Sequence, residues 1–213
     1  HLSNSGTLTA SSLTIDGADV INGGLIHAEK TLSLVTRLLD NRSSGVLYSP
    51  AALSLSLPEL KNAGIITSDA ALSLSGAALT NSGELSGASL LVDYDALNNA
   101  AGGLLLAQGT NRITARSVSS AGSIVGSTLA LYAGRLESAG LLQGDTGLSL
   151  TAEEMDLLAG SRTLAAGDLS LSGTTLTTAG QLQGENVSLR GRDWNNSGST
   201  LATGSLDVSA SGT

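Results

Sequence analysis

The chain lacks cysteine and phenylalanine altogether and has few aromatic side chains of any kind. Without cysteine, disulfides, thiolate chemistry and cysteine-rich metal sites are excluded together. Aromatic residues make up only 2% of the chain, although hydrophobic residues reach 41%. A compact globule of this size usually fills its irregular core with aromatic rings. A core of Leu, Ile, Val and Ala therefore predicts a narrow interior built from regular, repeated layers.

Proline and charge are also scarce. The 213 residues include 2 Pro but 27 Gly, and 13% are charged. Disordered linkers carry more proline and charge, so these glycines are expected to form turns within an ordered fold. The net charge of −8 disfavours nucleic acids and anionic membrane surfaces as partners, because both attract basic proteins.

Long apolar runs and a signal segment are missing as well. No run of 18 apolar residues occurs, so no membrane insertion is expected. The chain begins at His1, with no Met, basic stretch or apolar stretch after it. We interpret it as an internal fragment of a longer protein, with residues 1–213 forming one repeat segment without separate domains.

A short phrase ending in glycine recurs along the whole chain, in forms such as Asn-Ser-Gly, Asn-Ala-Gly and Thr-Ala-Gly. Its period is about 19 residues, which predicts about eleven repeats. The aligned glycines are Gly6, Gly24, Gly45, Gly64, Gly83, Gly103, Gly122, Gly140, Gly160, Gly180 and Gly198. An aliphatic residue usually follows two places later; Arg162 and Thr200 interrupt that column.

Each repeat also contains an aliphatic-x-aliphatic pair, which is typical of a strand because alternate side chains point to opposite faces. Stacking the repeats would align these residues in an interior ladder. The sixth repeat offers Ile113 and Ala115 instead. The predicted ladder residues are Leu13, Ile15, Leu32, Leu34, Leu53, Leu55, Leu72, Leu74, Leu90, Val92, Leu129, Leu131, Leu148, Leu150, Leu169, Leu171, Val187, Leu189, Leu206 and Val208.

The pattern predicts an all-β, right-handed parallel β-helix, a solenoid of about eleven coils. Left-handed hexapeptide helices are disfavoured because they repeat an aliphatic residue every six positions, which this chain does not. Asn22, Asn62, Asn81 and Asn196 stand two residues before their glycines and are predicted at the turns. Asn tolerates turn conformations, and stacked side-chain amides can hydrogen-bond along a rod.

Few residues suggest chemistry. Asp93 and Asp95 would project from one side of a strand, but a solvated face is the simpler interpretation. His27 has no carboxylate or second His nearby in the repeat, so neither a metal site nor a catalytic base is expected. The remaining candidates for a weak binding site, for example on a glycan, are Trp194, Arg190, Arg192 and Tyr94. Trp194 more simply replaces Leu in a core column.

The stretches 38–42, 79–83 and 97–99 resemble the filamentous haemagglutinin repeats of large bacterial exoproteins. This family includes haemagglutinin adhesins and contact-dependent inhibition proteins of two-partner secretion systems. The resemblance implies a Gram-negative, secreted or surface-bound protein, exported unfolded by an outer-membrane transporter. It carries over no catalytic residue and no cofactor.

The resulting hypothesis is a non-enzymatic shaft that projects a distal adhesive or toxic tip, with adjacent coils of the same parent chain as its neighbours. One alternative is a segment that itself binds a cell-surface receptor or glycan. A β-helix polysaccharide lyase or hydrolase is the less favoured alternative, since such sites need clustered carboxylates and bases on neighbouring coils.

Overall fold

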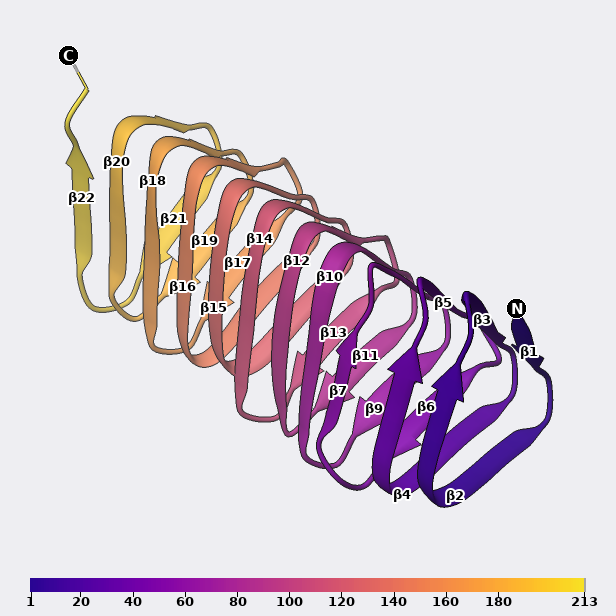
Figure 1. Ribbon diagram of the computed structural model, residues 1–213. Coiled ribbons are helices and arrows are strands. Elements are labelled where there is room, and N and C mark those ends of the chain that lie inside the picture. The colour runs from indigo at the N-terminus through magenta and orange to yellow at the C-terminus, as the bar shows by residue number, and fades with distance from the viewer. Residues whose placement is uncertain (213) are drawn as a thin grey trace.

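The computed structural model describes residues 1–212, which form one rod of about eleven stacked coils (Figure 1). Every strand pair is parallel and joins residues of successive coils. The predicted all-β parallel solenoid with a period of about 19 residues is confirmed. Its right-handed sense stays a prediction, in line with the strong preference of parallel strand connections.

Three sheets run along the rod, each receiving one stretch from every coil. The first sheet, after the turn glycines, contains β6 (Val46–Ser49), β9 (Ile65–Ser68), β11 (Glu84–Gly87), β13 (Leu104–Ala107), β17 (Arg162–Ala165), β19 (Gln181–Gly184) and β21 (Ser199–Ala202). The second contains β7 (Leu53–Ser56) and β22 (Leu206–Ala210). The third, before the turns, contains β1 (Leu2–Asn4), β3 (Asp19–Asn22), β5 (Leu38–Asn41) and β8 (Glu59–Asn62).

The longer strands bend around corners and contribute to more than one sheet. Those that join the first and second sheets are β2 (Thr7–Asp16) and β4 (Leu25–Val35). Those that join the second and third are β10 (Ala71–Asn81), β12 (Ser89–Asn99), β14 (Thr110–Ser120), β18 (Asp168–Thr178) and β20 (Val187–Asn196). The strands β15 (Ser123–Ser138) and β16 (Leu141–Leu157) pass through all three. Within residues 1–212 no helix is long and apolar enough to cross a membrane.

Alternate side chains of each strand point into the rod and stack on their equivalents in the next coil. In the first sheet, for example, Ile26, Leu47 and Ile66 stack with register pairs between successive coils and are fully buried. Each Å² of apolar area that such stacks bury stabilises the fold by roughly 25 cal/mol. Tyr94 and Trp194 are the aromatic side chains that pack with this aliphatic core. The interior is therefore as narrow and regular as the composition predicts.

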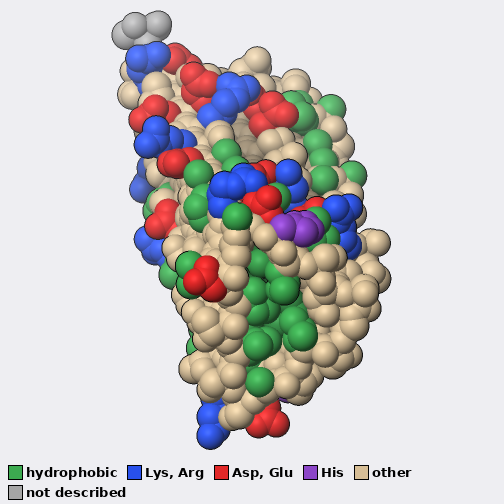
Figure 2. All heavy atoms as spheres, turned by 45° about the vertical axis from the view of Figure 1, so that its right-hand side comes forward, with side chains coloured by type: hydrophobic (Ala, Val, Ile, Leu, Met, Phe, Trp, Pro, Cys, Tyr) green, Lys and Arg blue, Asp and Glu red, His purple; other side chains and the backbone are tan. Residues whose placement is uncertain are grey.

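Most of the expected ladder residues are buried in the second sheet, and the exceptions lie near the two ends of the rod. Leu206 and Val208 are 51% and 42% exposed, because no coil of the described residues covers them. Leu13 is half-buried in the first coil. Figure 2 shows the same effect, with hydrophobic side chains gathered at the end of the rod that faces the viewer.

The sixth coil differs from the expected pair. Asn111 and Ile113 pair with Leu90 and Val92, so Asn111 occupies the first ladder position and Ile113 the second. Asn111 is fully buried there, and its Nδ2 donates to the carbonyl oxygens of Leu105 and Val125 at 3.3 and 3.0 Å. A polar residue is tolerated in the core column because these backbone acceptors satisfy its amide protons.

The turn asparagines form a buried amide ladder. In each of the first five steps, Nδ2 of one Asn donates to Oδ1 of the next at 2.8–2.9 Å, over 18 to 21 residues. The ladder consists of Asn4, Asn22, Asn41, Asn62, Asn81 and Asn99. Asn196 lies outside it, because it is exposed and accepts a hydrogen bond from Thr178 Oγ1 instead.

The ninth coil has a register that the glycine alignment missed. Arg162 and Thr163 pair with Leu141 and Leu142, so the inward position belongs to Thr163 and the turn position to Ser161, not Gly160. Gly160 instead supplies a positive φ of 85° one residue earlier, as Gly102 does with 84°. Leu164, which could have filled the column, is on the outward side and only half-buried.

Candidate functional site

The four residues considered for binding do not form one site. Trp194, Arg190 and Arg192 lie on β20, near the C-terminal end of the rod, whereas Tyr94 lies on β12, several coils away. No single ligand of moderate size would contact both groups.

Trp194 replaces a leucine at the edge of the core. It pairs with Leu176 of the preceding coil, packs against the buried core and donates from Nε1 to Thr178 Oγ1 at 3.0 Å. Arg190 and Arg192 are exposed and pair with Asp207 at 3.5 Å and Asp193 at 3.0 Å. Exposed pairs of this kind contribute little stability. The cluster therefore resembles a core position with solvated flanks.

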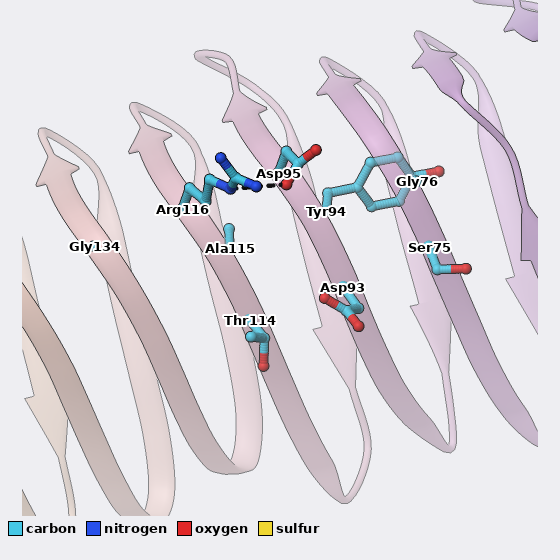
Figure 3. A pocket seen from close by; sticks show the side chains of 9 residues that line it. All are labelled: Ser75, Gly76, Asp93, Tyr94, Asp95, Thr114, Ala115, Arg116 and Gly134. Carbon is cyan, nitrogen blue, oxygen red and sulfur yellow. Dashed lines mark ion pairs between the residues drawn. The ribbon is translucent and has the colours of Figure 1, made fainter.

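Tyr94 faces the interior of the rod. Its side chain is 2% exposed, and its ring lies beside Gly76 of the preceding coil (Figure 3). A Cβ on Gly76 would come within 2.8 Å of Tyr94 Cε1, so this glycine makes room for the ring. Burial raises the pKa of Tyr94, and within residues 1–212 its hydroxyl has no hydrogen-bond partner. Tyr94 nevertheless lines a hollow in the surface, so its place among the candidate binding residues stays a prediction.

The neighbours of Tyr94 line a hollow at the corner between the second and third sheets. Asp93 and Asp95 point outward, and Asp95 Oδ1 lies 3.1 Å from Arg116 Nε on the next coil (Figure 3). The hollow has a volume of about 500 Å³. Its other lining residues include Ser75 and Thr114. Small residues at the floor, rather than a lid or a loop, create this space.

A second hollow of about 400 Å³ lies on the third sheet in the same coils. The outward residues of three successive coils are small there, whereas Arg135 and Glu137 stand at its edge. The small residues are Ala78, Thr80, Ala96, Asn98, Ser117 and Ser119. Together the two hollows make a shallow depression on one side of the rod, lined by both polar and apolar atoms.

The polar groups of this depression offer hydrogen bonds and charge. Hydroxyl, carboxylate and guanidinium groups could contact a polar ligand such as a sugar. Within residues 1–212 there is no group of three or more His, Cys, Asp or Glu that could hold a metal ion. The lining places the hydroxyls of Ser75 and Thr114 and the guanidinium of Arg116 in the same hollow as Asp93 and Asp95.

Sequence reasoning missed an aromatic stack on the outer face of the first sheet. The rings of His27 and Tyr48 lie 5.0 Å apart at an angle of 11°. Tyr48 donates its hydroxyl to Asp69 Oδ2 at 2.6 Å, and this bond raises the pKa of Tyr48. Both aromatic residues stand three places after a turn glycine, Gly24 and Gly45, so the repeat alignment contained the signal.

Curated proteins similar to this chain are very large. The chain is 76% identical over all 213 residues to the 16S rRNA endonuclease CdiA of Enterobacter cloacae subsp. cloacae, of which it spans 6%. The chain is a segment of a CdiA-type exoprotein. It is also 35% identical over 184 residues, 86% of its length, to the tRNA nuclease CdiA of Escherichia coli O6:K15:H31, covering 4% of that protein.

A third CdiA protein, the deoxyribonuclease CdiA of Dickeya dadantii, is 36% identical over 114 residues, 53% of the chain and 3% of its own length. The expected membership in the contact-dependent inhibition exoproteins is confirmed, with this chain as a β-solenoid segment of a CdiA-type protein. No model of a known protein family matches the chain, and no solved structure matches it significantly.

Proposed function

We propose that this segment is part of the shaft of a large, secreted CdiA-type exoprotein of a Gram-negative bacterium. The shaft holds a distal toxic or adhesive part away from the cell that produces it. Continuous parallel pairing of backbone along the rod gives stiffness, and the aliphatic and amide ladders add to it without disulfides.

The observation that carries this proposal is the breadth of the matches. Related segments occur in CdiA proteins named for three activities, on 16S rRNA, on tRNA and on DNA. A stretch shared by proteins with different named substrates does not determine the substrate. We therefore assign this segment a structural, non-enzymatic role.

The family resemblance adds two proposed partners. An outer-membrane transporter of the two-partner type would export the chain unfolded, and adjacent coils of the same parent would continue the rod at both ends. The exposed Leu206 and Val208 at one end support the second proposal, because the next coil would bury them.

The test is a pair of deletions in the full-length exoprotein. Removing residues 63–81 joins Asn62 to Ser82 and deletes one whole coil, since Asn62 and Asn81 are 19 residues apart and stack directly. The rod should shorten by about 4.8 Å with export and target-cell inhibition retained. Removing only 63–72 destroys the register and should impair folding. Loss of inhibition after the whole-coil deletion, with normal export, would contradict a passive shaft.

The second candidate function is direct binding of a receptor or glycan through the depression around Asp93 and Arg116. Its distinguishing experiment is the double substitution Asp93→Asn and Asp95→Asn in the full-length protein, with Trp194→Leu as a separate variant. A shaft role predicts that cell attachment is unchanged in both. Loss of attachment in either variant, with normal export, would favour binding by this segment.

A further inference from the structure

The amide ladder is interrupted in the coils that contain Ser138 and Leu157. Asn99 Nδ2 still donates to Ser120 Oγ at 3.3 Å, but the buried hydroxyl of Ser138 has no partner among residues 1–212. Leu157 follows in the same column and has no polar atom to offer. Side-chain hydrogen bonding in the column resumes only where Thr178 donates to Asn196. Within the described residues, the steps from Ser120 to Ser138, from Ser138 to Leu157 and from Leu157 to Thr178 therefore lack the buried side-chain bond that joins the earlier coils.

Backbone pairing continues across this step, so the rod is not broken there. The amide of Leu158 donates to the carbonyl of Ser138 at 2.8 Å, and Ala179 donates to Leu157 in the same way. The difference from the earlier coils is confined to side chains. Local opening, rather than global unfolding, is the property that such a difference changes.

An ion cluster lies on the outer face of the same two coils. Arg135 contacts Glu154 through Nη1 at 2.7 Å and Asp156 through Nη2 at 2.9 Å, while Glu137 lies 3.8 Å from Nη2. The bond to Glu154 raises the pKa of Arg135. Arg135 pairs in register with Glu154, and Ser138 pairs with Leu157, so the cluster bridges the strands β15 and β16 whose inner ladder is interrupted.

We propose that these two coils form a salt-sensitive joint in the rod, in which the external Arg135 cluster holds together a step that the internal amide ladder does not. The buried amide bonds of the earlier coils are shielded from dissolved ions. The cluster is exposed, with 51% of the Arg135 side chain accessible, so salt screens it. Ionic strength thus acts on the charged side-chain bonds that cross this step. The exposed pairs of Arg37 with Asp19 and Glu59 are screened in the same way, but the amide ladder also joins their coils.

The charges around Arg135 give the joint a diagnostic response. Three carboxylates surround one guanidinium, so removing the positive charge leaves Glu137, Glu154 and Asp156 to repel one another. Added salt weakens attraction in the native protein but screens repulsion in Arg135→Gln. The two proteins should therefore respond to salt in opposite directions.

The test is amide hydrogen exchange, followed by mass spectrometry, on the full-length exoprotein at about 10 mM and about 1 M NaCl, where the Debye length falls from about 30 to 3 Å. Exchange in residues 154–158 should become roughly threefold faster at high salt than exchange in residues 78–82, which lie on the Asn ladder. Equal salt responses of the two segments would overturn the proposal, and this comparison needs no variant.

Two variants separate the cluster from general salt effects. In Arg135→Gln, high salt should slow exchange in residues 154–158. In Arg116→Gln, which removes the single ion pair with Asp95 beside a continuous ladder, exchange in residues 96–120 should keep its native salt response. An Arg135→Gln protein that responds to salt as the native protein does would also contradict the joint.

Discussion

The first six coils and the later coils of the rod differ in one buried position at the turn. In the first six, Asn occupies it every time, and the five bonds from one amide to the next measure 2.8–2.9 Å. In the later coils the position holds Ser120, Ser138, Leu157, Thr178 and Asn196, and the side-chain bonds are interrupted. The backbone ladder runs through both regions unchanged.

The comparison separates the interactions that define the fold from those that only reinforce it. An Asn side chain carries a donor and an acceptor, so identical residues can propagate a ladder without limit. A Ser hydroxyl is shorter, and Leu replaces hydrogen bonding with apolar contact. Because the rod continues through all of them, backbone pairing and the aliphatic columns suffice for the architecture, whereas the amides add stability coil by coil.

The largest expected effect concerns the aliphatic column that both regions share. Leu74 is 1% exposed, so Leu74→Asp would bury a charge without a partner and should cost several kcal/mol of unfolding free energy. Chemical denaturation of the purified chain would measure this as a lower unfolding midpoint. The matched control is Ser73→Asp, on the outward side of the same strand, which should be nearly neutral. Equal midpoints for the two variants would mean that the inward and outward assignment is incorrect.

The second effect should be found only in the Asn region. Asn62 accepts from Asn41 and donates to Asn81 at 2.8 Å, and it also donates to the carbonyl of Glu84 at 3.0 Å. Asn62→Leu leaves these buried groups unpaired and should cost about 2–3 kcal/mol in the same denaturation experiment. Asn196→Ala, at the exposed end of the column, should cost well under half as much. A cost for Asn196→Ala that equals that of Asn62→Leu would remove the ladder as the explanation.

Much of the fold could be predicted from the sequence because every coil of a solenoid has nearly the same geometry, which appears as a periodic pattern of residues. The spacing of turn glycines, and the alternation in pairs such as Leu72 and Leu74, indicated the parallel stacking and most of the buried column. These signals lie within one coil and are repeated in the others, so a position misassigned in one coil does not change the pattern that the rest indicate. Contacts that depend on a single coil have no such support.

The details that the sequence did not reveal all depend on register between particular coils. Gly160 resembles the other turn glycines, yet the extra residue in that turn shifts the inward position to Thr163. The repeat pattern does not show that the Tyr94 ring fills space beside Gly76 on the preceding coil. The Arg135 cluster joins residues 19 and 21 positions apart, so a one-residue error in alignment would hide it.

A smaller effect should accompany the reverse exchange in the later region. Leu157→Asn removes a buried aliphatic side chain but offers an acceptor to the unpartnered Ser138 hydroxyl. These changes partly offset each other, so we expect a net cost of about 1 kcal/mol, less than that of Asn62→Leu. The double variant Ser138→Asn with Leu157→Asn should be more stable than Leu157→Asn alone. If the second substitution adds to the cost, the column in this region does not accept an extended ladder.

The smallest effect should have the opposite sign. The Tyr94 hydroxyl is buried with no partner among residues 1–212, so Tyr94→Phe relieves an unsatisfied polar group while the ring keeps its place beside Gly76. We expect the unfolding free energy to be unchanged or to rise by up to about 1 kcal/mol. Tyr48→Phe is the matched control, because it deletes a hydroxyl that does bond, to Asp69, and should be slightly destabilising. A clear loss of stability in Tyr94→Phe would mean that the hydroxyl has a partner in solution, which would reopen the interior beside Gly76 as a polar site within the Asn-laddered part of the rod.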